Sequence, residues 1–226
     1  MNHESDIAFQ LSQVQASLPA GVTLVAVSKT HPVGAVRAAY DAGQRIFGES
    51  RPQELAAKQA ELPHDIVWHM IGHLQTNKIK LIVPFVALIH SVDSARLAGA
   101  IQREAAKCGR TVDILLEIHV AAEETKTGWE FAELLAWVQS GAPAQLPNLR
   151  MRGVMGIATN TSDESLIRND FNRLKQCFDR LKPCFDASFD TLSKGMSDDY
   201  PLAVDCGSTM VRVGSRIFGA RDYSRK

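Results

Sequence analysis

The sequence predicts a (β/α)8 barrel, and three observations favour this fold class. Eight short apolar segments indicate strands, and helical patterns separate most of them. The first segment is β-branched and short, which is typical of a strand buried on both faces. The length of 226 residues suits such a barrel with few additions. The alternative that the same alternation permits is an open, doubly wound parallel sheet.

Each element follows from a local pattern. Apolar residues at helical spacing from 7 to 18 predict a first helix, and Pro19-Ala20-Gly21 ends it. The first strand is expected at 22–27, and Pro32 in a first helical turn then begins the next helix, which ends before Gly43. The other strands are expected at 45–48, 66–71, 87–91, 113–118, 151–157, 189–193 and 210–213.

Composition restricts the class of protein. The chain has 25 Lys and Arg against 25 Asp and Glu, so no overall charge recruits nucleic acid or an anionic membrane. Neither a secretory signal nor a stretch long enough to span a bilayer is recognised. The four cysteines lack zinc-ligand spacing and do not indicate a disulfide framework. We therefore expect one cytoplasmic domain covering residues 1–226, with no metal site.

Two regions could carry chemistry at the C-terminal mouth of the barrel. Lys29 follows the first strand, where partial desolvation favours the neutral amine that forms a Schiff base, although a surface lysine has somewhat better odds from spacing alone. The segments 193–197 and 207–215 are rich in Gly, Ser and Thr and could cradle a phosphate, or could be ordinary turns. Neither a Gly-x-Gly-x-x-Gly motif after the first strand nor a P-loop is present, which counts against nucleotide binding.

Two further polar residues lie within strand segments. His69 suits a hydrogen-bonded histidine of the barrel interior about as well as a direct ligand role. Arg212 lies in an apolar strand, and because its guanidinium stays charged it requires a carboxylate or a bound ligand as acceptor.

Several motifs resemble those of one known family. They are Val-Ala-Val-Ser-Lys-Thr at 25–30, Phe-Gly-Glu at 47–49, Trp-His-Met-Ile-Gly-x-Leu-Gln-x-Asn-Lys at 68–78, Gly-Met-Ser-x-Asp at 195–199 and Gly-Ser-Thr-Met-Val-Arg-Val-Gly at 207–214. From about residue 24 to 223, the chain is similar to the pyridoxal phosphate homeostasis proteins, which are single-domain relatives of the alanine racemase barrel.

The resemblance implies a barrel of the alanine racemase N-terminal type that binds pyridoxal 5′-phosphate (PLP), with Lys29 as the Schiff-base lysine. It implies that Arg212 faces either the pyridine nitrogen or the phosphate. The other residues expected at the cofactor are Ser50, His69, Met196, Ser197, Ser208, Thr209, Gly214 and Ser215. Three residues depart from the family pattern: Ser50 and His119 stand where Asn is usual, and Lys194 stands where Met is frequent, which adds an amine near the proposed phosphate or one that points to solvent.

The function that the resemblance implies is PLP homeostasis by a carrier or regulator, without established catalysis, that holds PLP and could deliver it to apo-enzymes. We expect a monomer, because the racemase dimer relies on a second domain that this chain is expected to lack. One alternative is a PLP enzyme with weak racemase-like activity and Lys29 as base. It is disfavoured because racemases of this fold use a Tyr from a second domain, which this chain is expected to lack. A lower alternative is a Schiff-base aldolase acting on a phosphorylated sugar.

Overall fold

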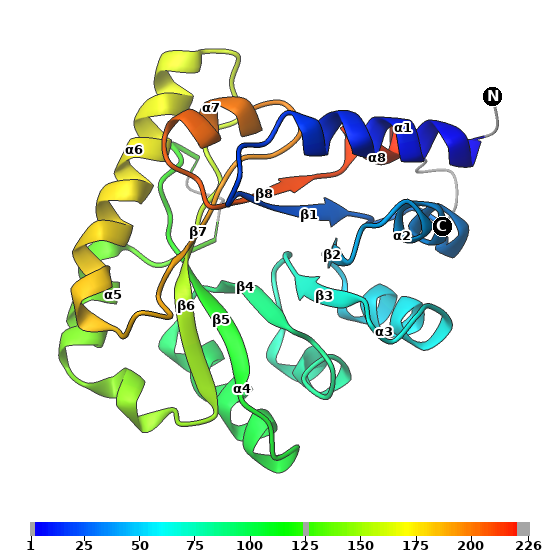
Figure 1. Cartoon of the computed structure of the whole chain (residues 1–226). Coiled ribbons are helices and arrows are strands. Elements are labelled where there is room, and N and C mark those ends of the chain that lie inside the picture. The colour runs from blue at the N-terminus through cyan, green and yellow to red at the C-terminus, as the bar shows by residue number, and fades with distance from the viewer. Residues whose placement is uncertain (1–2, 124–126, 221–226) are drawn as a thin grey trace.

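Eight parallel strands form a closed barrel in a computed structural model that describes residues 3–123 and 127–220 (Figure 1). The strands are β1 (Thr23–Val27), β2 (Ile46–Glu49), β3 (Val67–Met70), β4 (Leu88–Val92), β5 (Val112–Glu117), β6 (Leu149–Met155), β7 (Thr191–Ser193) and β8 (Met210–Val213). Closure occurs where β1 pairs with β8, with Thr23 opposite Met210 and Val25 opposite Arg212. The predicted barrel is therefore confirmed, and the open-sheet alternative is wrong.

Helices surround the strands in the expected alternation. They are α1 (His3–Ala16), α2 (Val33–Asp41), α3 (Pro52–Glu61), α4 (Ala95–Lys107), α5 (Phe131–Gln139), α6 (Glu164–Leu181), α7 (Tyr200–Asp205) and α8 (Ser215–Phe218). Between β3 and β4 the connection is a 3-10 helix, η1 (Thr76–Leu81), and two shorter ones are η2 (Ala142–Gln145) and η3 (Lys182–Cys184). The first helix packs against α2 and α8, so the two ends of the described chain meet along β1 and β8 (Figure 1).

The strands are buried on both faces. A large apolar cluster lies between the strands and the helices, and a second, smaller one joins Val25, Leu88, Leu115, Met155 and Met210 from five different strands. Burial of both faces explains why the strand segments are almost continuously apolar. The polar exceptions fall into two groups: buried side chains such as His90, Ser193 and Arg212, which form the interior part of the site described below, and charged residues at the N-terminal ends of β5 and β6.

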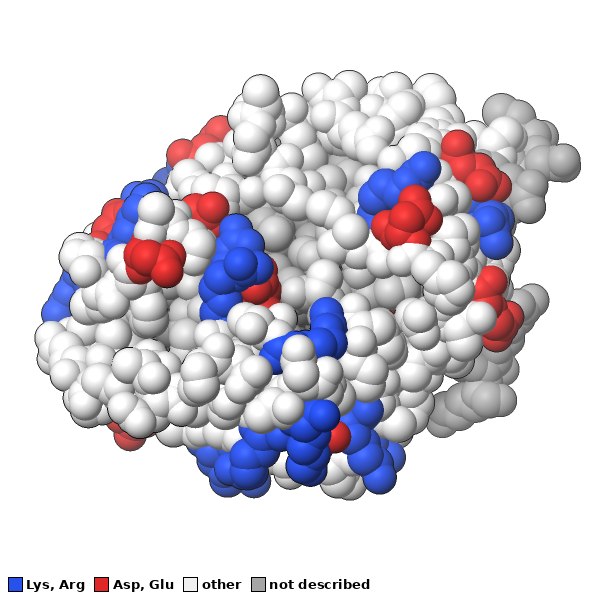
Figure 2. Space-filling model, turned by 60° about the horizontal axis from the view of Figure 1, so that its bottom comes forward, with Lys and Arg blue, Asp and Glu red and all other residues white. Residues whose placement is uncertain are grey.

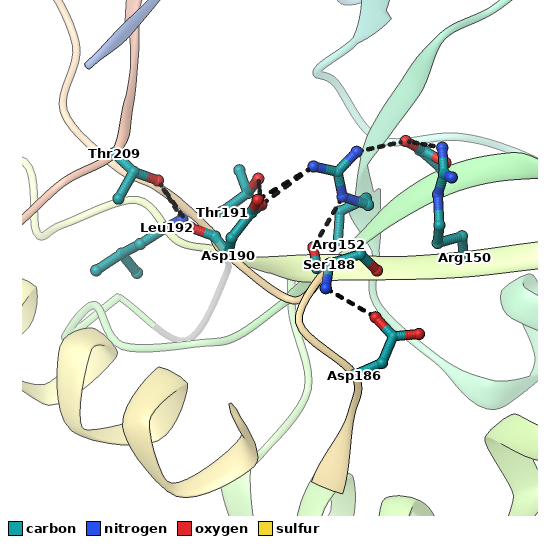
Figure 3. A network of polar contacts seen from close by, with 9 residues as sticks. Arg150, Arg152, Asp186, Ser188, Asp190, Thr191, Leu192 and Thr209 are labelled. Atoms are coloured by element: carbon teal, nitrogen blue, oxygen red, sulfur yellow. Dashed lines mark hydrogen bonds and ion pairs between the residues drawn. The ribbon is translucent and has the colours of Figure 1, made fainter. Parts of the chain in front are cut away.

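A network of ion pairs joins the N-terminal ends of β5, β6 and β7 (Figure 3). Arg152 donates to Asp113 at 2.9 Å and to Asp190 at 3.1 Å, and Arg150 donates to Asp113 at 2.7 Å. Polar contacts at this end of such a barrel usually serve stability, while chemistry is placed at the C-terminal end. A functional site is therefore expected at the C-terminal mouth.

The surface carries both signs of charge. On the face drawn in Figure 2, acidic and basic side chains lie next to each other in a few separate groups on an otherwise uncharged surface, and basic ones gather along its lower edge. This mixture agrees with the formal net charge of zero. None of the helices in the described part of the chain has the length and apolar character needed to cross a membrane.

Candidate functional site at the C-terminal mouth of the barrel

A cleft of about 180 Å³ opens where β1 and β8 end, and Lys29 lies in its wall. The predicted residues that line the same cleft are Met196, Ser197, Arg212, Gly214 and Ser215. They come from opposite ends of the chain because barrel closure makes β1 and β8 neighbours. The expectation that Lys29 shares one cleft with Arg212 and with the loops after β7 and β8 therefore agrees with the geometry.

The loops after β7 and β8 are joined to each other at this cleft. The Gly214 amide donates to the Ser197 hydroxyl at 3.1 Å, and the Met196 amide donates to a carboxylate oxygen of Asp199 at 2.5 Å. Gly214 also lies close to the end of β1, since a Cβ built on it would fall 2.9 Å from the Val27 carbonyl oxygen. Only glycine fits there, and its absent side chain lets the backbone after β8 approach the backbone that leads to Lys29.

Arg212 lies between the cleft and the barrel interior. Its side chain is 4% exposed, and its two terminal nitrogens donate to the Ser193 hydroxyl at 2.7 Å and the Gly156 carbonyl at 3.2 Å. Burial lowers the pKa of Arg212 to about 10, so the guanidinium remains charged at neutral pH. The cleft thus has a fixed cation whose hydrogen bonds restrict its orientation.

A chain of buried hydrogen bonds continues from Arg212 into the barrel. His90 Nδ1 lies 3.1 Å from Ser193 Oγ, and His90 Nε2 lies 3.0 Å from His69 Nδ1. Burial lowers the pKa of His69 to about 3 and that of His90 well below its ordinary value, so both rings are neutral. Because Ser193 accepts from Arg212, its own hydrogen is directed at His90 Nδ1, and His90 then donates from Nε2 to His69.

The expectation that His69 contacts the cofactor is corrected by this arrangement. His69 is 4% exposed, and it lines a separate cavity of about 460 Å³ together with Thr23, Arg152 and Asp190, which mark the N-terminal end of the barrel. Its position is that of the alternative expectation, a hydrogen-bonded histidine of the barrel interior.

Ser208 and Thr209 are also placed away from the cleft, which contradicts their expected part in the phosphate site. Both precede β8, so they lie at the N-terminal end of that strand, whereas Gly214 and Ser215 follow it. The Thr209 hydroxyl accepts from the Leu192 amide at 2.8 Å (Figure 3), and the buried Ser208 hydroxyl contacts three backbone carbonyls, among them that of Lys194 at 2.9 Å. Their roles are therefore contacts between β7 and β8.

The three departures from the family pattern lie outside the wall of the cleft. Ser50 follows β2 at the correct end of the barrel, but its backbone packs against Gly72. His119 follows β5 and contacts the Glu123 carbonyl at 3.0 Å. Lys194 is completely buried, and its amine donates at 2.9 Å to the carbonyls of both Phe171 and Cys206, so it faces neither the cleft nor solvent. Burial lowers its pKa to about 8.

The structure adds cleft residues that the sequence analysis missed. His31 and Asp198 line the cleft beside Lys29 and Ser197. Ser193, which the sequence analysis named only as part of a possible phosphate cradle at 193–197, does not line the cleft but anchors Arg212 from within β7. A hydroxyl residue at the end of an apolar strand was the available signal for Ser193, whereas His31 is positioned by its turn, which no spacing rule predicts. Within the described ranges, no group of three or more His, Cys, Asp or Glu side chains could hold a metal ion.

Comparison with known proteins places this geometry in a family. Residues 3–222 match the model of the alanine racemase N-terminal domain. The pyridoxal phosphate homeostasis protein of Pseudomonas aeruginosa is 40% identical over 95% of this chain and 91% of its own length. That of Escherichia coli K12 is 38% identical over 98% of this chain and 100% of its own.

Solved structures agree with this placement. PipY from Synechococcus elongatus, determined with PLP bound, is 40% identical over 94% of this chain and 100% of that chain, with a TM-score of 0.86. The alanine racemase of Bartonella henselae shares the fold at 17% identity, with a TM-score of 0.75, over 96% of this chain and 59% of the racemase chain. The chain therefore belongs to the alanine racemase N-terminal domain family and, within it, to the pyridoxal phosphate homeostasis proteins.

Proposed function

We propose that this protein binds PLP in the cleft at the C-terminal mouth of the barrel and acts in PLP homeostasis. The observation that carries the proposal is that the primary amine of Lys29 shares one cleft with Ser197, Ser215 and the buried guanidinium of Arg212. PLP supplies an aldehyde that bonds covalently to a primary amine, and a phosphate that hydroxyls and backbone amides can hold. The residues of the cleft fit both parts of the molecule.

Four residues of the cleft have distinct roles in this proposal. Lys29 provides the amine. The Ser197 hydroxyl accepts from the Gly214 amide, which leaves its hydrogen available to a phosphate oxygen, and the Ser215 hydroxyl and backbone complete the phosphate site. Met196, which is 40% exposed, lines the cleft and would contact the ring of the bound cofactor.

We assign Arg212 to the pyridine nitrogen, which the sequence alone left open. Its guanidinium is held from the interior side by Ser193 and Gly156, whereas Ser197 and Ser215 come from the loops and suit the phosphate. A permanently charged donor at the ring nitrogen keeps that nitrogen unprotonated, which weakens the ring as an electron sink. This favours holding PLP over using it for carbanion chemistry.

The non-catalytic role is supported by the position of the tyrosines. Tyr40 donates to Asp65 at 2.8 Å, and the Tyr200 hydroxyl lies 2.8 Å from that of Ser17, so neither lines the cleft. Tyr223 lies outside the described residues. The second candidate function, a PLP enzyme with weak racemase-like activity, is favoured by His31, a titratable group in the cleft wall. Exchange of amino-acid α-protons in deuterated water would distinguish it from a carrier.

The direct test is the visible spectrum of the purified protein, followed by borohydride reduction and peptide mapping. We expect a yellow protein whose label maps to Lys29, and a colourless protein that PLP cannot reconstitute would overturn the proposal. We further propose that the protein is a cytoplasmic monomer that can pass PLP to apo-enzymes. Its four free cysteines suit a reducing compartment. The molar mass in solution, measured by light scattering, tests the monomer, and reactivation of an apo-transaminase by the PLP-loaded protein tests the transfer.

A further inference from the structure

A buried ion pair lies directly behind the turn that carries Lys29. Lys58 of α3 is 5% exposed, and Glu49 at the end of β2 is completely buried. The Lys58 amine donates to Glu49 Oε1 at 2.7 Å, to Glu54 Oε1 at 2.8 Å and to the Ser28 carbonyl at 2.8 Å. An ammonium group has three hydrogens, and these acceptors account for all of them.

The same groups hold the residues on both sides of Lys29. On the preceding side, the Ser28 hydroxyl donates to Glu49 at 2.6 Å while the Ser28 carbonyl accepts from Lys58. On the following side, the Thr30 amide donates to Glu54 at 2.7 Å. The backbone that carries Lys29 is thus fixed at both neighbours by side chains that take no part in lining the cleft.

The turn is also held in an unfavourable conformation. Thr30 has a φ of +69°, and it is the only residue other than glycine with a positive φ in the described part of the chain. A β-branched residue in this region is strained, and such strain persists only where the surroundings impose it. The Thr30 hydroxyl is buried without a hydrogen-bond partner among the described residues, so no hydrogen bond of this side chain offsets the strain.

We infer that Glu49, Glu54 and Lys58 form a clamp that positions the amine of Lys29 for covalent attachment of PLP. The inference rests on the proposed function, because it concerns the same lysine. The clamp residues are positioning residues: they touch the backbone around Lys29 and not the cofactor. A pair that served stability alone would not require contacts on both sides of one residue, nor a strained residue next to it.

The test separates covalent attachment from phosphate-anchored binding. In Glu49→Gln and Lys58→Met, attachment of PLP to Lys29, followed by absorbance and by mass after borohydride reduction, is expected to slow about tenfold or more, because misplacement of a reacting group by about 1 Å costs that much or more. Binding of pyridoxine 5′-phosphate, which lacks the aldehyde, should stay within about twofold of the original protein, since the phosphate site is untouched.

The matched control is Lys107→Met, the same substitution in the exposed pair that Lys107 forms with Glu104 at 2.9 Å. This control should change neither the rate of PLP attachment nor the affinity for pyridoxine 5′-phosphate. If Lys58→Met fails to fold, the nearly isosteric Glu49→Gln decides the question. Unchanged attachment in a folded clamp variant overturns the inference, whereas failure of the original protein to attach PLP at all overturns the proposed function instead.

A third variant, Thr30→Gly, should keep or raise stability while it slows the covalent attachment of PLP. Glycine adopts a positive φ without strain, so resistance to denaturant should be kept or increased. The turn also becomes more mobile, so covalent attachment should slow by at least about threefold. If resistance and attachment both stay as they are, or both fall together, Thr30 belongs to an ordinary structural turn and the inference loses its support there.

Discussion

Replacing Ser193 by Ala tests the hydrogen-bonded chain that holds Arg212. The Ser193 hydroxyl accepts from Arg212 at 2.7 Å and lies 3.1 Å from His90 Nδ1, and all three side chains are buried. The alanine leaves two buried polar groups without their partner. Each such loss costs about 1–3 kcal/mol, and the charged guanidinium lies at the upper end of that range. The free energy of unfolding should therefore fall by about 3–5 kcal/mol.

Urea unfolding of four proteins measures this effect and its origin. They are the original protein, Ser193→Ala, Arg212→Leu and the double variant. Because Arg212 and Ser193 are in direct contact, their double-mutant cycle should give a coupling energy of about 1–3 kcal/mol. Once the guanidinium has been removed, loss of the serine should cost much less, since only His90 then lacks a partner.

The absorbance of bound PLP tests whether these hydrogen bonds also affect the cofactor. In Ser193→Ala the guanidinium keeps only the Gly156 carbonyl as a buried acceptor, so its orientation in the cleft is less restricted. The absorbance band of bound PLP should shift, because the charge near the ring changes position. Additive effects in the cycle, together with an unchanged band, would refute the reasoning and leave Ser193 as a packing residue.

Three further predictions follow from particular residues. Lys29→Ala should abolish the label fixed by borohydride while leaving phosphate-anchored binding of PLP measurable by equilibrium dialysis, and a label of unchanged position would show that another lysine reacts. Gly153→Ala should cost more than about 3 kcal/mol and yield little folded protein on expression, because its Cβ would fall 1.7 Å from the Thr191 carbonyl oxygen. Since burial lowers the pKa of His69 from 6.5 to about 3, the unfolded chain takes up a proton that the folded one refuses, and unfolding free energy should fall as pH drops below 6.5. His69→Gln should reduce that slope by up to about 1.4 kcal/mol per pH unit in urea titrations at pH 5–6.5, and an identical slope would contradict the neutral assignment.

The strands and their order could be predicted because parallel strands buried on both faces appear in the sequence as short, almost continuously apolar segments. A run such as the one that ends at Val27 is apolar on both sides of the pleat and is followed by polar residues where the strand leaves the barrel. This pattern located Lys29. The family motifs then assigned a role to Arg212, which the structure places in the same cleft.

Some site residues were predicted wrongly because their environment depends on which end of a strand they lie at, and not on their residue type. Ser208 and Thr209 have the composition of a phosphate loop, but they precede β8 and therefore emerge at the opposite mouth from Ser215. Lys194 was expected near the phosphate or in solvent because lysines are seldom buried. It is buried because two backbone carbonyls accept from its amine, and these come from α6 and from the end of α7, which no local pattern brings together.

Barrel closure is what turns these separate residues into one site. The pairing of Val25 with Arg212 fixes the register between β1 and β8, and it brings the exits of the two strands into contact at Val27 and Gly214. Beside that contact, the backbone around Lys29 is held by Glu49 of β2 and by Glu54 and Lys58 of α3, while Arg212 is held by Ser193, which His90 contacts in turn. The backbone that carries Lys29 and the guanidinium of Arg212 are thus held by two separate buried networks, one outside the barrel wall and one inside it. A change in either network should therefore alter one end of the bound ring without moving the other, and this separability distinguishes positioning of the cofactor from general stability.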